Sequence, residues 1–184
     1  GIDIDVTGNI SLANGAELDI RTNGGDVRFA STGNVRFDAG ASTVIETNGG
    51  NVTLNSRSND SASGYVDLRY TTIRTGGGDV TIGGGSDPLT GYGVASTVNG
   101  VRFGDTTVVT DGGNLVANGQ SGTSTGVNIG GSSRVTIDTG SGNITLRGRS
   151  DSGNGVAFQS GTASGGQTLT TTTGNINVTG SSNT

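Results

Sequence analysis

The sequence lacks several residue types on which common functional sites depend. Its 184 residues include no cysteine and no histidine, and all ten basic residues are arginines. Without cysteine there can be no disulfide, no thiolate nucleophile and no cysteine-based metal site. Without histidine the chain has neither the usual general base near neutral pH nor the commonest metal ligand. These absences disfavour several classes of enzyme and metalloprotein, and we expect no catalytic site and no cofactor.

Large side chains are also scarce. Hydrophobic residues make up 29% of the chain and aromatics 4%, beside 37 glycines and one proline. The low hydrophobic content alone would suggest disorder, but a net charge of -5 is too small for the usual disordered chain, so an ordered fold would need something other than a bulky core. The acidic balance argues against nucleic acid as a partner. No apolar run is long enough to span a membrane, and we expect no membrane insertion.

A ten-residue template recurs six times along the chain. It reads apolar-x-Thr-x-small-Gly-Asn/Asp-apolar-x-apolar, as in IETNGGNVTL at residues 45–54. Residues 8–12 resemble a partial seventh copy. Steps of 25, 28, 35, 29 and 32 residues separate the glycines before Asn or Asp, which are Gly25, Gly50, Gly78, Gly113, Gly142 and Gly174. Repeats at such periods indicate a solenoid.

The apolar residues alternate with other residues, which is the period of a β-strand. A second motif, Val-x-Phe/Ile/Leu, lies between the copies of the template, and no stretch has the 3.6-residue apolar stripe of a helix. We therefore predict an all-β parallel β-helix with three short strands per coil and about six coils. It would form one domain over residues 1–184, and the chain reads as an interior fragment of a longer repetitive protein.

Aligning the copies produces columns of like residues that would fill the core. The columns are Ile20, Ile45, Ile73, Val108, Ile137 and Leu169; Val27, Val52, Val80, Leu115, Ile144 and Ile176; and Phe37, Leu68, Phe103, Ile129 and Phe158. Two outward columns begin with alternating charge, Arg21, Glu46, Arg74 and Arg36, Asp67, Arg102. Opposite charges on neighbouring strands attract, so this alternation supports the alignment.

The glycine pairs raise the question of a phosphate-binding loop. No helix and no Gly-Lys-Ser/Thr follows them, so we interpret each as a turn in which the Asn or Asp side chain bonds the local backbone. A threonine precedes each turn by two or three residues and is expected to point inward. Ice binding is the rival interpretation, but it needs a flat outward threonine array, whereas the outward columns considered are charged or mixed.

Aspartates in the variable loops are the candidates for a calcium site. Asp60, Asp87 and Asp151 each follow the start of a third strand by seven or eight residues, so we expect them to line up at one corner. Asp3 and Asp5 are the only other calcium candidates. The nonapeptide of calcium-binding β-rolls is absent, and solvated turn carboxylates are the favoured interpretation. We therefore expect no metal site. The carboxylates are also too scattered for a polysaccharide-cleaving enzyme.

The repeats resemble the repetitive region of filamentous-haemagglutinin-like exoproteins, the secreted adhesins of Gram-negative bacteria. The resemblance rests on GGGDVTI (residues 76–82), GSGNITL (140–146) and NGVRF (99–103), and it extends over nearly the whole chain. It implies a right-handed β-helix, export across the outer membrane by two-partner secretion, and a fibrous role at the cell surface. Parallel crossovers are in general right-handed, which agrees.

The expected function is therefore structural and adhesive. The chain would be a non-catalytic stalk segment of an extracellular fibre, whose variable loops contact a host, cell or abiotic surface or a glycan. The alternative is a filament subunit that self-associates through its open ends or loop edges. Both interpretations place the protein outside the cell.

Overall fold

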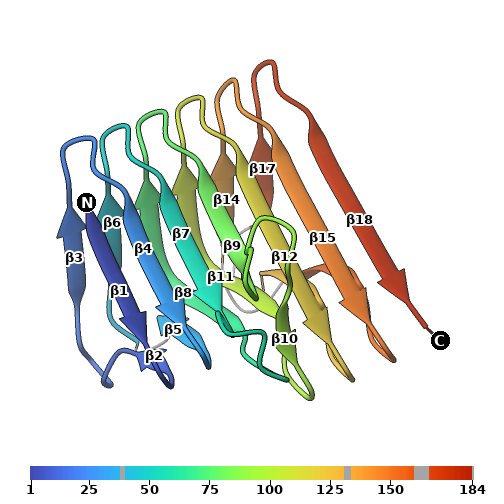
Figure 1. The fold of residues 1–184 in the computed structure, drawn as a ribbon. Coiled ribbons are helices and arrows are strands. Elements are labelled where there is room, and N and C mark those ends of the chain that lie inside the picture. The colour runs from blue at the N-terminus through green and yellow to red at the C-terminus, as the bar shows by residue number, and fades with distance from the viewer. Residues whose placement is uncertain (38–39, 131–133, 160–165, 184) are drawn as a thin grey trace.

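The chain forms a parallel β-solenoid of about six turns, as predicted. The computed structural model describes residues 1–37, 40–130, 134–159 and 166–183, and the regular structure within these ranges consists of strands alone. Figure 1 shows the turns stacked side by side, with the N-terminus at one end of the row and the C-terminus at the other. Two main sheets face each other across the core.

The first sheet, sheet A, stacks β1 and the six strands that follow the Gly-Asn/Asp pair of the repeated template. Its strands pair in parallel in the order β1 (Ile2–Val6), β4 (Val27–Ser31), β7 (Val52–Ser56), β9 (Val80–Gly84), β12 (Leu115–Ser121), β15 (Ile144–Ser150) and β18 (Ile176–Ser182). A short strand, β10 (Gly93–Ala95), also pairs with β12. The valine column aligned in the sequence is the observed register, because Val27, Val52 and Val80 are direct partners.

The second sheet, sheet B, holds the two remaining stacks of strands. One stack contains β2 (Ile10–Ser11), β5 (Val35–Phe37), β8 (Val66–Arg74), β11 (Val101–Val109), β13 (Val127–Gly130) and β16 (Val156–Gln159). The other contains β3 (Leu18–Arg21), β6 (Thr43–Glu46), the second halves of β8 and β11, β14 (Val135–Asp138) and β17 (Thr168–Thr170). Two strands thus belong to both stacks.

This sharing corrects the prediction of three separate strands in every coil. In the β8 and β11 coils, one nine-residue strand replaces the first two strands. Tyr70 (φ 53°) and Asp105 (φ 51°) interrupt the pairing between these strands, which resumes on both sides of them. A single residue in the left-handed region therefore bends the strand at the corner, where the other coils use a longer connection.

Residues 8–12 were also assigned to the wrong stack. They resemble the start of a third strand, but Ile10 and Ser11 pair with Val35 and Arg36 in sheet B. The first member of the third-strand stack is instead β1, whose Ile2 pairs with Val27. The five-residue Gly-Asn pattern fits either stack, so only the pairing partners distinguish them.

The aligned apolar columns form the core. Ile45, Val52, Leu68 and Phe103 are fully buried, and the register joins their columns from coil to coil. The charged columns also take the predicted register, and Arg21 forms an ion pair with Glu46 of the next coil. Because this pair is exposed, its contribution to stability is at most about 1 kcal/mol.

The threonine column points inward at the corner between sheets B and A, which confirms that prediction. Thr110 is fully buried, and its hydroxyl donates to the carbonyl of Gly113 in its own turn. The same hydroxyl lies 3.3 Å from the carbonyl of Thr139 in the next coil. Thr47 and Thr75 make the same pair of contacts, so the column links successive coils.

Replacing one buried threonine hydroxyl should destabilise the solenoid. Thr110→Val keeps the shape of the side chain but removes the donor to the buried carbonyl of Gly113. We expect a loss of about 1–3 kcal/mol in the free energy of unfolding, measured by urea titration. Thr81→Val on the outer face of sheet A is the control and should change it by less than about 0.5 kcal/mol. Equal losses in the two variants would contradict the role assigned to the column.

The side chain at the Asn/Asp position of the template does not bond its own turn, contrary to the prediction from the sequence. The Asn51 side-chain oxygen accepts the backbone N–H of Asp79 at 2.8 Å, and Asp79 Oδ1 accepts the N–H of Asn114 at 2.6 Å. The side chains therefore form a ladder between coils instead of bonding their own turn. Asn51 and Asp79 are exposed to solvent, which explains why a carboxylate is tolerated in the ladder.

Candidate functional site

A lobe, residues 85–92, interrupts the regular coils between β9 and β10. It belongs to the longest step of the repeat, 35 residues from Gly78 to Gly113, and it contains the only proline of the chain. Figure 1 shows this connection folded back over the outer face of sheet A, in front of β12. Insertions at a fixed corner of a solenoid are frequent carriers of function, so the lobe is the candidate contact site.

Polar side chains of sheet A hold the lobe in place. Asn118 of β12 is completely buried beneath it and donates from Nδ2 to the carbonyls of Pro88 (3.1 Å) and Leu89 (2.9 Å). Arg147 of β15 lies 3.3 Å from the Asn118 side-chain oxygen and 3.4 Å from the Leu89 carbonyl. At the far end of the lobe, the Arg149 guanidinium stacks on the Tyr92 ring at 4.3 Å. The lobe is thus anchored to two neighbouring strands.

Between the lobe and the side-chain ladder runs a shallow trough of about 360 Å³. One wall is Leu89, whose side chain is 50% exposed, and Val116 of β12 also lines the trough. The other lining residues are Asp79, Val80, Thr81, Asn114, Asn143 and Thr145. The trough combines carboxylate, amide and hydroxyl groups with two accessible apolar side chains, a surface suited to contact with a polar partner.

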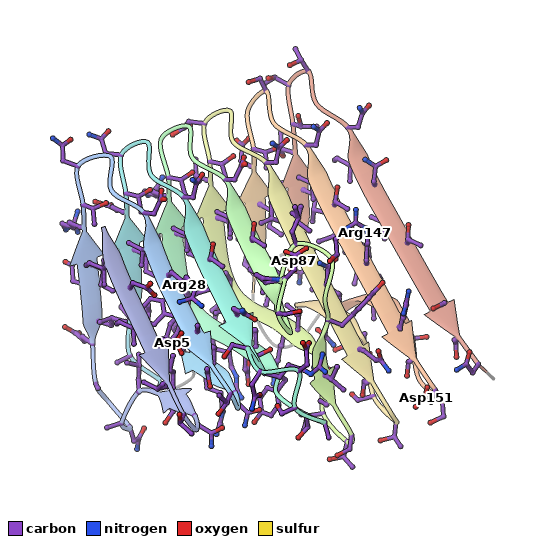
Figure 2. All side chains as sticks on the ribbon, viewed as in Figure 1. Asp5, Arg28, Asp87, Arg147 and Asp151 are labelled. Carbon is purple, nitrogen blue, oxygen red and sulfur yellow. The ribbon has the colours of Figure 1, made fainter. Side chains whose placement is uncertain are left out.

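The three calcium candidates do not form one cluster within the described residues. Asp87 sits on the lobe, where its carboxylate accepts bonds from the Leu89 N–H (3.0 Å) and the Thr90 hydroxyl (2.8 Å). Asp60 accepts the Ser86 N–H at 3.1 Å, and Asp151 accepts from the Asn183 side chain. Figure 2 shows Asp87 and Asp151 well separated. Within the described ranges, no three acidic side chains come together in a geometry that could hold a metal ion.

Asp3 and Asp5, the remaining candidates, face an arginine. Arg28 Nη1 lies 2.8 Å from Asp3 and 3.4 Å from Asp5, and Figure 2 shows Arg28 beside Asp5. The hydrogen bond that Arg28 donates to the Asp3 carboxylate, helped by the negative charges of Asp3 and Asp5, raises the pKa of Arg28 above its ordinary value. Arginine is therefore the counter-ion of both carboxylates in the structure.

The sequence predicted the insertion that contains the lobe, but it did not predict the residues that anchor the lobe to sheet A. The 35-residue step indicates a variable connection over residues 84–100, yet the anchoring residues lie in other coils. Asn118 occupies an outward strand position, where the pattern predicts an exposed side chain. The signals available in the sequence were the single proline and the polar Asn118, and neither indicates that the lobe folds onto sheet A.

Comparisons with models of protein families, with curated proteins and with solved structures found no match. The solenoid fold is therefore supported by the strand register and the buried core of this chain alone. The resemblance to haemagglutinin-like exoproteins is an interpretation of the sequence repeats. In the described part of the chain, no helix has the length and apolarity needed to cross a membrane.

Proposed function

We propose that this chain is a structural and adhesive segment of an extracellular fibre at a bacterial surface. The observation that carries the proposal is the continuous stack of seven parallel strands in sheet A, from β1 to β18, which keeps one register throughout. Each coil adds about 4.8 Å to such a stack, so regular coils make a rod. A rod of this kind can hold a contact surface at a distance from its attachment point.

The contact surface in this proposal is the lobe with its trough. The lobe lies outside the regular coil and is held by Asn118 and Arg147, so it presents a fixed shape without disturbing the stack. A host surface, an abiotic surface or a glycan is the partner, bound without catalysis. Secretion to the cell surface belongs to the same proposal.

One observation favours the alternative, a self-assembling filament subunit. At the β18 face, Phe158, Ile176 and Val178 are 44–50% exposed, although they continue columns that are buried in earlier coils. Another coil stacked there would bury them. A further coil of the same polypeptide fits the stalk, whereas a coil from a second copy fits the filament.

Removing one repeat tests the rod. Deletion of residues 79–113 joins Gly78 to Asn114 and removes one complete period. Because each coil contacts mainly its neighbours, we expect the remaining coils to fold and the maximum dimension from small-angle X-ray scattering to fall by about 5 Å. A β-sheet circular dichroism spectrum is the control for folding. Global unfolding of the deletion variant would refute a modular stalk.

Electron microscopy and a surface-binding assay complete the test. Isolated short rods support the stalk, and long polymers at micromolar protein support the filament. For adhesion, the probe is mucin-coated and bare polystyrene in a quartz-crystal microbalance. We expect deletion of the lobe to reduce adsorption several-fold, while deletion of residues 13–15, in the exposed loop between β2 and β3, leaves it unchanged. Equal adsorption by both variants would remove the lobe from the proposal.

A further inference from the structure

A second hollow, of about 160 Å³, lies on the outer face of sheet B, where arginines from three successive coils meet. Arg36 comes from β5, Arg69 from β8 and Arg102 from β11. Asp67 occupies the middle of this arrangement, since Arg36, Asp67 and Arg102 are direct register partners across the three strands. We call this hollow the arginine pocket.

The arginine pocket already holds one carboxylate. Arg69 Nε lies 3.2 Å from Asp67 Oδ1, and Arg69 Nη2 lies 2.7 Å from Asp67 Oδ2. This is the paired geometry in which a planar guanidinium matches a planar carboxylate. The Asp67 side chain is only 10% exposed, so this carboxylate is largely shielded from water, whereas the Arg69 side chain is 34% exposed. Shielding strengthens the electrostatic interactions available within the pocket.

A glycine brings two of the arginines close together. Gly104 is the register partner of Arg69, and a β-carbon at Gly104 would lie 3.3 Å from Arg69 Cγ and 3.8 Å from Arg102 Nε. The two side chains therefore flank the space that a larger residue at this position would occupy. Gly104 has an ordinary φ, so its small size at this contact is the feature that matters.

The charge of the pocket is opposite to that of the whole chain. Its described lining contains three arginines and one aspartate, whereas the protein carries a net charge of -5. Each guanidinium has five N–H donors, so an arginine that pairs with Asp67 can also serve a ligand. The guanidinium of Arg102 makes no hydrogen bond or ion pair within the described residues. A local excess of positive charge attracts an anionic ligand.

The remaining walls suit a small polyhydroxylated ring. The Asn99 side-chain oxygen accepts from the Ser124 hydroxyl at 2.9 Å and from the Thr125 N–H at 3.3 Å, which orients its amide group. Tyr65 adds a hydroxyl group and a ring, and Val98 is a 46% exposed apolar side chain. Hydroxyl, amide and apolar groups around a cationic centre match a sugar that carries an acidic group.

We propose that the arginine pocket binds the carboxylate of an acidic sugar, with Arg102 as the principal ligand residue and Arg36 and Arg69 beside it. The pocket already pairs the planar carboxylate of Asp67 with the fork of Arg69, and the ligand carboxylate would take the same paired geometry. Asn99 and Tyr65 contact the hydroxyl groups of the ring. The inference deepens the adhesive function by naming a ligand class, and it rests on that function. It also places a binding site on the face opposite the lobe.

The test is an NMR titration of the ¹⁵N-labelled full chain with glucuronate, with glucose as the neutral probe and inorganic sulfate as the tetrahedral anion. We expect glucuronate to shift the resonances of Tyr65, Asn99 and Arg102, and glucose to leave them unchanged. Arg102→Gln should weaken glucuronate binding about tenfold or more, because it removes charge-assisted hydrogen bonds. Arg102→Lys should restore it only in part.

Arg74→Gln is the matched control, because Arg74 is an exposed arginine of β8, the strand next to that of Arg102, and lies outside the pocket. Its affinity for glucuronate should equal that of the wild type. Unchanged binding in Arg102→Gln, or no glucuronate shifts in a correctly folded wild type, overturns the inference. Sulfate binding as tight as that of glucuronate overturns the carboxylate assignment. Scattering from the same samples separates the two proposals, because a rod that binds no glucuronate contradicts only the pocket.

Discussion

Gly113→Ala should lower the free energy of unfolding by about 3 kcal/mol or more. Gly113 has an ordinary φ, but a β-carbon there would collide with the carbonyl oxygen and carbon of Gly78 and lie 2.9 Å from the Gly77 carbonyl. These are backbone atoms of the preceding coil, and they cannot move away without breaking the ladder of sheet A. The measurement is the urea midpoint followed by circular dichroism.

Gly166→Ala is the matched control for this substitution. Gly166 is exposed, and no atom lies within 4 Å of the position that its β-carbon would take. We expect a change of less than about 0.5 kcal/mol. Equal midpoints for the two variants would show that the coils can separate to admit a methyl group, and would contradict the close approach of the backbones.

Phe103→Ala should cost about 3–5 kcal/mol, the usual range for removing a buried aromatic ring. Phe103 is fully buried in the column between Leu68 and Ile129. The backbone ladders hold neighbouring coils in register on both sides of Phe103, so these coils cannot collapse into the cavity without losing that register. Thermal and urea unfolding measure the loss.

The same column supplies the control. Phe158 pairs with Ile129 one coil further on, but its side chain is 50% exposed. Phe158→Ala should therefore cost less than half as much as Phe103→Ala, because burial determines the loss. A similar cost at both positions would mean that Phe158 is buried in solution, as expected if another coil covers it.

Most of the solenoid could be predicted because each coil repeats the same short pattern of glycine, threonine and alternating apolar residues. The glycine at position 113 and its five equivalents mark the close contact between coils, and the alternation around Val80 separates inward from outward residues. The prediction was wrong where the same short pattern, Gly-Asn followed by an apolar residue, precedes strands of both sheets. Residues 8–12 were assigned to the third strand because Gly-Asn precedes strands in both sheets.

Side-chain partners were harder to predict than strand positions. The Asn51 and Asp79 side chains bond the next coil, although the turn preference of these residues predicts a local bond. Tyr70 fuses two strands into one by adopting a positive φ, which no side-chain pattern requires. Both features depend on the distance between coils, which a linear pattern does not contain.

The sequence by itself determined the solenoid, its register and the inward columns, because these follow from a repeat that every coil carries. Only the tertiary structure shows which surface each insertion packs against. The lobe packs on Asn118. Arg69 lies with Arg36 and Arg102 around one pocket, beside the space that the small Gly104 leaves open. Contacts of this kind join residues from different coils through unique side chains, so no repeated pattern encodes them, and both candidate binding surfaces arise from them.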